Sequence, residues 1–97
     1  MQKSVMEKTL EIRLRREVES RGGQALKWVS PNFAGVPDRI ILLPPGRCVF
    51  VELKSPRGRL SALQRKRKRD LERLGFEVYC ICSDADINEF IGEVLES

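Results

Sequence analysis

The chain of 97 residues is 41% hydrophobic and 33% charged, and its formal net charge is +4. This composition is typical of a globular protein and excludes a largely disordered chain, while the length suits one domain covering residues 1–97. No apolar run approaches the ~20 residues that a membrane-spanning helix needs, and the N-terminus lacks the apolar segment of a signal peptide. We therefore expect an intracellular protein without a membrane partner.

The residue types that are missing narrow the chemistry. Histidine is absent, which excludes Ser-His-Asp and Cys-His nucleophile systems and His-ligated zinc. No glycine-rich phosphate loop occurs, so we expect no nucleotide cofactor. Cys48, Cys80 and Cys82 are odd in number and lack a CxxC spacing, which favours reduced, buried thiols over disulfides or a zinc site. Any hydrolytic chemistry would have to use carboxylates, lysine and a hard metal ion.

The first predicted elements are a helix over residues 4–21 and a strand over residues 24–30. The apolar positions of the helix recur every four residues and form one stripe: Met6, Leu10, Leu14 and Val18. Ser4 begins a capping box that Glu7 completes. In the strand, we expect Trp28 to be a core residue rather than a platform for base stacking.

Two β-rich runs, residues 37–43 and 47–54, are joined by Pro44-Pro45-Gly46 and predict an antiparallel hairpin. The later elements are expected to be a helix over residues 61–74, a strand over residues 76–82 and a helix that begins after Ser83. The apolar positions of these two helices are Leu63, Leu71 and Leu74, then Ile87, Ile91 and Leu95. The order α-β-β-β-α-β-α indicates an α/β fold with a central mixed sheet flanked by helices.

Three polar side chains of the hairpin are expected to converge. Glu52 and Lys54 share one face because side chains alternate along a strand, and a three-residue turn would place Asp38 opposite Glu52, about 5 Å away at Cβ. Hard cations such as Mg²⁺, or Mn²⁺, prefer oxygen ligands. Asp38, Glu52 and the backbone carbonyl of Leu53 are therefore candidate metal ligands. Lys54 is the candidate that orients an attacking water or stabilises developing charge.

These residues also have an ordinary structural explanation. A Glu-x-Lys pair is a common feature of a solvent-exposed strand face, and an acid after a proline is a common turn residue. Three features favour a site. The pair lies inside a strongly apolar strand, the turn length places Asp38 opposite it, and a basic tract begins directly afterwards.

Two further side chains carry both kinds of interpretation. Glu11 lies on the margin of the first helix stripe and is a better candidate than Glu7 to reach the metal site, although an exposed salt bridge would also explain it. Glu7 is already accounted for by its capping box with Ser4. Gln64 could face the site, while a second capping box with Ser61 would explain it without function.

Basic residues gather after the hairpin, where eight Lys or Arg residues and no acid lie between Lys54 and Arg69. Such a tract is either a solvated helix face or a surface that contacts nucleic-acid phosphates. The candidate DNA contacts are Arg57, Arg59, Arg65, Lys66, Lys68 and Arg69. Arg67 falls within the apolar stripe, and we expect its side chain to extend from there toward solvent.

The run Gly35-Val36-Pro37-Asp38-Arg39, the later run Val49-Phe50-Val51-Glu52-Leu53-Lys54-Ser55-Pro56 and then Gln64 resemble the stand-alone VRR-NUC nucleases of phages and bacteria. Those proteins are similar to Holliday-junction resolvases of the PD-(D/E)xK superfamily. The resemblance covers nearly the whole chain and implies a restriction-endonuclease-like PD-(D/E)xK core. Carried onto this sequence, it implies one catalytic set: Glu11, Asp38, Glu52, Lys54 and Gln64.

The resemblance also implies a homodimer that cleaves branched DNA, four-way (Holliday) junctions above all, in the cytoplasm of a bacterium or of a phage-infected host cell. A symmetric junction calls for two equivalent sites, so a C2 dimer is the natural assembly. Val5 and Ile12 lie off the helix stripe and are candidates for its interface. The alternative is a non-catalytic DNA- or RNA-binding module whose acids only close a salt bridge.

Overall fold

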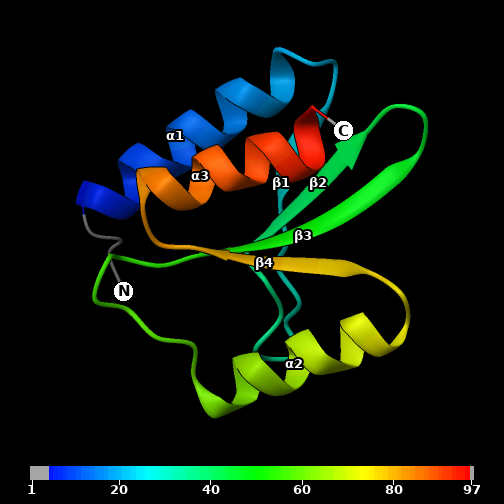
Figure 1. Ribbon diagram of the computed structural model, residues 1–97. Coiled ribbons are helices and arrows are strands. Elements are labelled where there is room, and N and C mark those ends of the chain that lie inside the picture. Colours follow the sequence, from blue (N-terminus) through cyan, green and yellow to red (C-terminus); the bar gives the residue numbers. More distant parts are fainter. Residues whose placement is uncertain (1–4, 97) are drawn as a thin grey trace.

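The computed structural model describes residues 5–96, in which helices cover both faces of a four-stranded sheet (Figure 1). Helices α1 (Val5–Glu19) and α3 (Asp84–Phe90) lie side by side on one face, and α2 (Ala62–Arg73) lies on the other. The strands, in sheet order, are β1 (Gln24–Lys27), β2 (Arg39–Leu43), β3 (Arg47–Leu53) and β4 (Glu77–Ile81). Strands β1 to β3 pair antiparallel, and β4 joins β3 in parallel. The mixed sheet between helices confirms the predicted fold class and element order.

The main hydrophobic core lies between the sheet and the helices α1 and α3. Its members from α1 are Leu10, Leu14 and Val18, each at most 1% exposed, which confirms this part of the predicted stripe. Met6 is 47% exposed, so the buried stripe begins one turn later than predicted. The capping box predicted at Ser4 lies outside the described residues. No helix within residues 5–96 is both long enough and apolar enough to cross a membrane.

The hairpin register is the one that a three-residue turn predicts. Leu43 pairs with Arg47, and Arg39 pairs with Val51 at the far end. Gly46 lies in the turn with a φ of +109°, a conformation that glycine adopts without strain. Val49, Val51 and Leu53 of β3 therefore point into the main core, while the even-numbered residues between them point toward the α2 face.

The strand after α1 is shorter than predicted. Pairing between β1 and β2 ends at Lys27, and only one further backbone bond follows, from Trp28 N to Asp38 O at 3.0 Å. The next residue of the neighbouring segment, Pro37, has no N–H to donate, so the ladder cannot continue. Residues 28–38 form a loop instead.

The final helix differs from a regular α-helix. α3 continues into a π-helical turn, η1 (Ile91–Leu95), in which Glu96 N donates to Ile91 O at 2.9 Å. Ile87, Phe90 and Val94 are buried at the i, i+3 and i+7 spacing of a single helix face, while Ile91 is only partly buried. Of the apolar positions predicted here, only Ile87 is fully buried.

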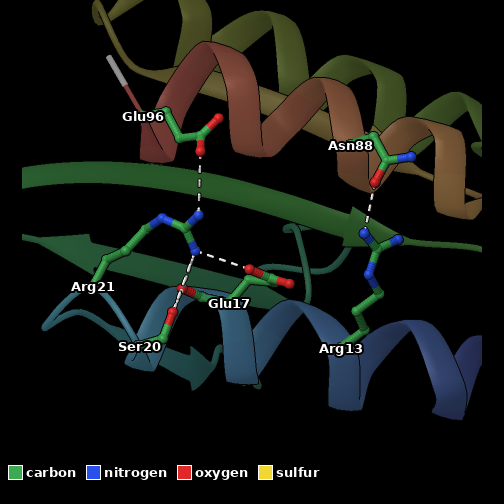
Figure 2. Close-up of polar contacts among 6 residues, drawn as sticks. All are labelled: Arg13, Glu17, Ser20, Arg21, Asn88 and Glu96. Atoms are coloured by element: carbon green, nitrogen blue, oxygen red, sulfur yellow. Dashed lines mark hydrogen bonds and ion pairs between the residues drawn. The ribbon is translucent and has the colours of Figure 1, made fainter.

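Polar contacts join α1 to the C-terminal segment (Figure 2). Arg13 Nη2 donates to Asn88 Oδ1 at 2.6 Å. Arg21, just beyond α1, pairs with Glu17 at 2.9 Å and with Glu96 at 3.6 Å. Each contact is partly solvated and stabilises the fold only slightly, but together they attach the middle of α1 and the residues just after it to the C-terminal segment.

The face that α2 covers is less well buried than predicted. α2 has no buried residue, and Leu63 and Leu74 are 40% and 74% exposed. Cys48, Cys80 and Cys82 are free thiols, as predicted, but they are half-buried rather than buried. The reason is that one short helix cannot cover a whole sheet face, so side chains that point to this side keep contact with solvent.

Candidate functional site

The candidate site forms where the start of β2, the end of β3 and the start of α2 meet. Asp38 directly precedes β2, and its Oδ1 accepts a hydrogen bond from Leu53 N at 3.1 Å. Because Arg39 pairs with Val51, the next position outward places Asp38 opposite Glu52. The two acids predicted to share a site are thus held on adjacent chain segments.

Glu52 is only 6% exposed although it is a carboxylate. Gln64 Nε2 lies 3.3 Å from Glu52 Oε1 and donates to it. The same side chain completes the capping box, since Gln64 Oε1 accepts from Ser61 N at 2.8 Å and Ser61 Oγ accepts from Gln64 N at 3.1 Å. Gln64 therefore both caps α2 and contacts Glu52, because the capping bonds orient its amide with the nitrogen toward Glu52.

Lys54 follows β3, and its backbone N–H donates to Ile81 O at 2.9 Å, which extends the β3–β4 pairing by one bond. A tight turn comes next, closed by a 2.8 Å bond from Gly58 N to Ser55 O. A Cβ added at Gly58 would lie 3.1 Å from Lys54 Cβ. The turn therefore packs against the base of the lysine side chain.

Glu11 reaches the sheet from the α1 side. Its carboxylate pairs with the guanidinium of Arg39, which is 8% exposed and lies one residue after Asp38. Arg39 Nε is buried and has no hydrogen-bond partner within residues 5–96. The salt bridge that the sequence offered as an alternative explanation of Glu11 is thus present, but its partner, Arg39, is buried rather than exposed. Arg39 is a residue that the sequence reasoning passed over, although an arginine inside an apolar strand was the available signal.

The oxygen ligands that the structure offers for a cation are few. No group of three or more His, Cys, Asp or Glu side chains with metal-binding geometry occurs in the described part of the chain. The donors available together are the carboxylates of Asp38 and Glu52 and the nearby backbone of Leu53. Such a set matches Mg²⁺, which usually binds one or two carboxylates and keeps several waters.

A narrow hollow with a cavity volume of about 10 Å³ lies at Glu52 and is lined among others by Pro37, Gln64 and Cys80. Cys80 is the strand partner of Glu52 across β3 and β4. Burial, then the neighbouring Cys82 and Glu52, raise the pKa of the Cys80 thiol to about 12. A thiol with this pKa is neutral at physiological pH, so Cys80 contributes no negative charge to the hollow.

Cys80 is therefore expected to resist alkylation in the folded protein. A pKa near 12 lowers the thiolate fraction at pH 8 about 1000-fold relative to an ordinary thiol, and higher nucleophilicity recovers roughly 30-fold of that. We expect iodoacetamide to modify Cys80 about 30-fold more slowly in the native protein than in urea, measured by tandem mass spectrometry. Free cysteine in the same two buffers corrects for the solvent, and equal rates would contradict the burial of this thiol.

The basic tract is largely available to solvent. Five of the six predicted DNA contacts are exposed: Arg57, Arg59, Arg65, Lys66 and Arg69. The sixth, Lys68, is half-buried and lines the hollow. Within α2, Lys66 pairs with Asp70 at 3.2 Å and Lys68 pairs with Glu72 at 2.9 Å. Such partly solvated pairs are weak and can be exchanged for phosphate contacts.

Arg67 behaves differently from the prediction. Instead of extending toward solvent, its guanidinium lies 3.6 Å above the centre of the Phe33 ring, and its Nε donates to Ala34 O at 2.8 Å. Trp28 is half-buried and stacks at a tilt on Phe50, with 5.1 Å between ring centres. Trp28 thus belongs to a small aromatic cluster on the α2 side rather than to the main core.

Comparison with known proteins agrees with this architecture. The model of the VRR-NUC domain family matches residues 3–85. A protein of Acyrthosiphon pisum secondary endosymbiont phage 1, named "Putative nuclease p44", is 39% identical over 79 residues, which are 81% of this chain and 85% of that protein. A solved structure described as a VRR_NUC domain superimposes with a TM-score of 0.87 at 22% identity, covering 94% of this chain and 99% of that one, and it supports the fold. The chain belongs to the VRR-NUC nuclease family.

Proposed function

We propose that this protein is a metal-dependent endodeoxyribonuclease of the PD-(D/E)xK type that hydrolyses phosphodiesters of branched DNA. One observation carries the proposal. Asp38 is bonded to the backbone of Leu53, the residue between Glu52 and Lys54, so all three functional groups originate at one end of the hairpin. Membership of the VRR-NUC family supports nuclease chemistry at this place.

The donor set fits a hard divalent cation, Mg²⁺ or Mn²⁺. Asp38 and Glu52 would hold it, with the carbonyl of Leu53 as a further ligand. A bound cation supplies Lewis-acid chemistry at the scissile phosphate. The bond from Leu53 N orients the Asp38 carboxylate, and Gln64 orients that of Glu52, so both ligands are fixed before the substrate arrives.

Lys54 is proposed to act on the attacking water or on the scissile phosphate. Its ammonium would orient the attacking water or stabilise the charge that develops on the phosphoryl oxygens. Glu11 would act at the rear of the site, where it pairs with Arg39 and so restrains the segment that carries Asp38. Arg57, Arg59, Arg65, Lys66, Lys68 and Arg69 would bind phosphates along the DNA without reading the sequence.

The proposed substrate is a four-way junction, and the proposed assembly is a C2 homodimer. Cutting two equivalent strands needs two equivalent sites, which a symmetric dimer supplies. Ile12 is 45% exposed on α1 and remains a candidate for the interface together with Val5. Sedimentation of the wild type and of Ile12→Glu tests this assignment directly.

Cleavage assays on labelled linear, flap, replication-fork and four-way DNA, with a titration of Mg²⁺ or Mn²⁺, test the function. We expect no cleavage without metal and the fastest cleavage on the four-way junction. Binding to all substrates without cleavage at any metal concentration would instead support the alternative, a non-catalytic nucleic-acid-binding module with a basic face. Equal rates on linear and branched DNA would contradict the branch selectivity.

A further inference from the structure

A second hollow lies beside the candidate site, between the loop of residues 28–38 and α2. Its volume is about 240 Å³, and its exposed wall is almost entirely apolar. The lining residues are Trp28, Phe33, Val36, Leu71 and Leu74, together with Arg67 and Asp70. Pockets for drug-sized ligands begin at about 300 Å³, so this one suits a smaller, flat fragment. Neither the metal ligands nor the proposed phosphate contacts account for it.

The loop that forms this hollow is held firmly against α2. Gly35 adopts a φ of +86°, and a Cβ added there would lie 2.7 Å from the Leu63 side chain, so only glycine permits this close approach. The bond from Arg67 to Ala34 O fixes the same segment at 2.8 Å. The hollow is therefore built before any ligand binds.

An aromatic ring is presented at the hollow. Phe33 is 52% exposed although Arg67 covers part of it with its guanidinium at 3.6 Å. An exposed ring next to an arginine is the arrangement on which unpaired bases stack, because every base has a π-face and the cation adds attraction. Leu74, 74% exposed, supplies a further apolar surface at the rim.

The two hollows adjoin each other through shared chain segments. Gly35 and Pro37 line the hollow of the candidate site, while Val36 between them lines the apolar one. On α2 the same division occurs, with Lys68 on one side and Arg67 on the other. A phosphodiester bound near Glu52 would thus have a neighbouring base next to the apolar hollow.

Charge indicates which occupant the surface accepts. α2 contains six basic and two acidic residues, so the surface around the hollow is positive. A second copy docked here through a two-fold axis would bring two positive helices together, which is unfavourable. Nucleic acid carries the complementary charge.

We propose that this hollow captures one unpaired nucleobase, stacked on Phe33, next to the phosphodiester that is cut. Base capture rests on the proposed function. The feature of branched DNA that the protein would recognise is then an unstacked base at the branch point. Base capture would favour branched or bulged DNA over a continuous duplex, because unstacking costs least where pairing is already lost.

The test measures dissociation constants in EDTA by fluorescence anisotropy. Three duplexes are compared: one with a single unpaired adenine, one with an abasic site in its place, and one fully paired. We expect the unpaired adenine to bind about tenfold more tightly than the abasic site, because only the adenine can stack on the Phe33 ring. Phe33→Ala and Phe33→Leu should remove this preference, whereas Phe33→Tyr keeps the ring and should retain it.

Val29→Ala is the matched control, because Val29 is apolar, lies in the same loop, is 77% exposed and does not line the hollow. Its preference should equal that of the wild type. No preference in the wild type, an equal loss on all three duplexes, or dissociation of a dimer by Phe33→Ala would overturn base capture. These binding measurements need no metal, so they are independent of the cleavage assay. Absence of cleavage would refute the proposed function, whereas the binding ratios alone decide whether a base is captured.

Discussion

Asp38→Asn is expected to abolish measurable DNA cleavage, a loss of roughly 10³-fold, while the affinity for DNA stays within about twofold. The substitution removes the charge of a proposed metal ligand but keeps an oxygen that can accept the bond from Leu53 N. The fold should therefore persist. Cleavage of a labelled four-way junction and anisotropy in EDTA measure the two quantities separately.

Lys54→Ala is likewise expected to abolish cleavage while DNA binding is retained. The contribution of Lys54 to the fold is the backbone bond to Ile81 O, which alanine keeps. Asp84→Asn and Lys27→Ala are matched controls for the two charge changes, since both residues are exposed and neither lines the hollow. Both controls should cleave like the wild type. If Asp38→Asn or Lys54→Ala lost binding as severely as cleavage, their catalytic assignment would be wrong.

Phe90→Ala is expected to lower the free energy of unfolding by about 3–5 kcal/mol. Phe90 is fully buried, and its ring meets that of Tyr79 edge-on with 5.2 Å between centres, which attaches α3 to the sheet. A domain of this size has only about 5–15 kcal/mol of stability in total. The variant should consequently unfold at much lower urea concentration, as followed by circular dichroism.

Phe33→Ala is the control for that measurement, because it deletes the same ring at a position that is 52% exposed. The ring stacks under Arg67 and about half of its surface is already in solvent, so the change in stability should stay within about 1 kcal/mol. Equal destabilisation by both substitutions would contradict the view that the core lies between α1, α3 and the sheet. It would also show that the loop of residues 28–38 is part of the stabilising core.

Local rules correctly predicted the register of the β2–β3 hairpin and the face on which its side chains lie. The turn Pro44-Pro45-Gly46 sets the strand register, and the alternation of side chains then assigns each residue to a face. From these two regularities Asp38 could be placed opposite Glu52 without any knowledge of the rest of the fold. The capping box that begins at Ser61 was equally predictable, because its partners lie within one helical turn.

The environment of these elements was less predictable. Periodicity identified α2 as a helix but could not show that its leucines stay largely exposed, since burial depends on how much of the sheet one helix covers. Likewise, the pairing of Glu11 with Arg39 joins residues 28 positions apart, and the partner is decided by where α1 packs.

By itself, the amino-acid sequence determined the order of elements, the hairpin register and the alignment of Asp38 with Glu52, because neighbouring residues and short turns control them. Only the tertiary structure decided that Gln64 both caps α2 and donates to Glu52, and that Phe33, Arg67 and Leu74 border one hollow. Those arrangements depend on how the loop, α2 and the sheet pack, and packing follows from the shape of the whole chain rather than from any local pattern.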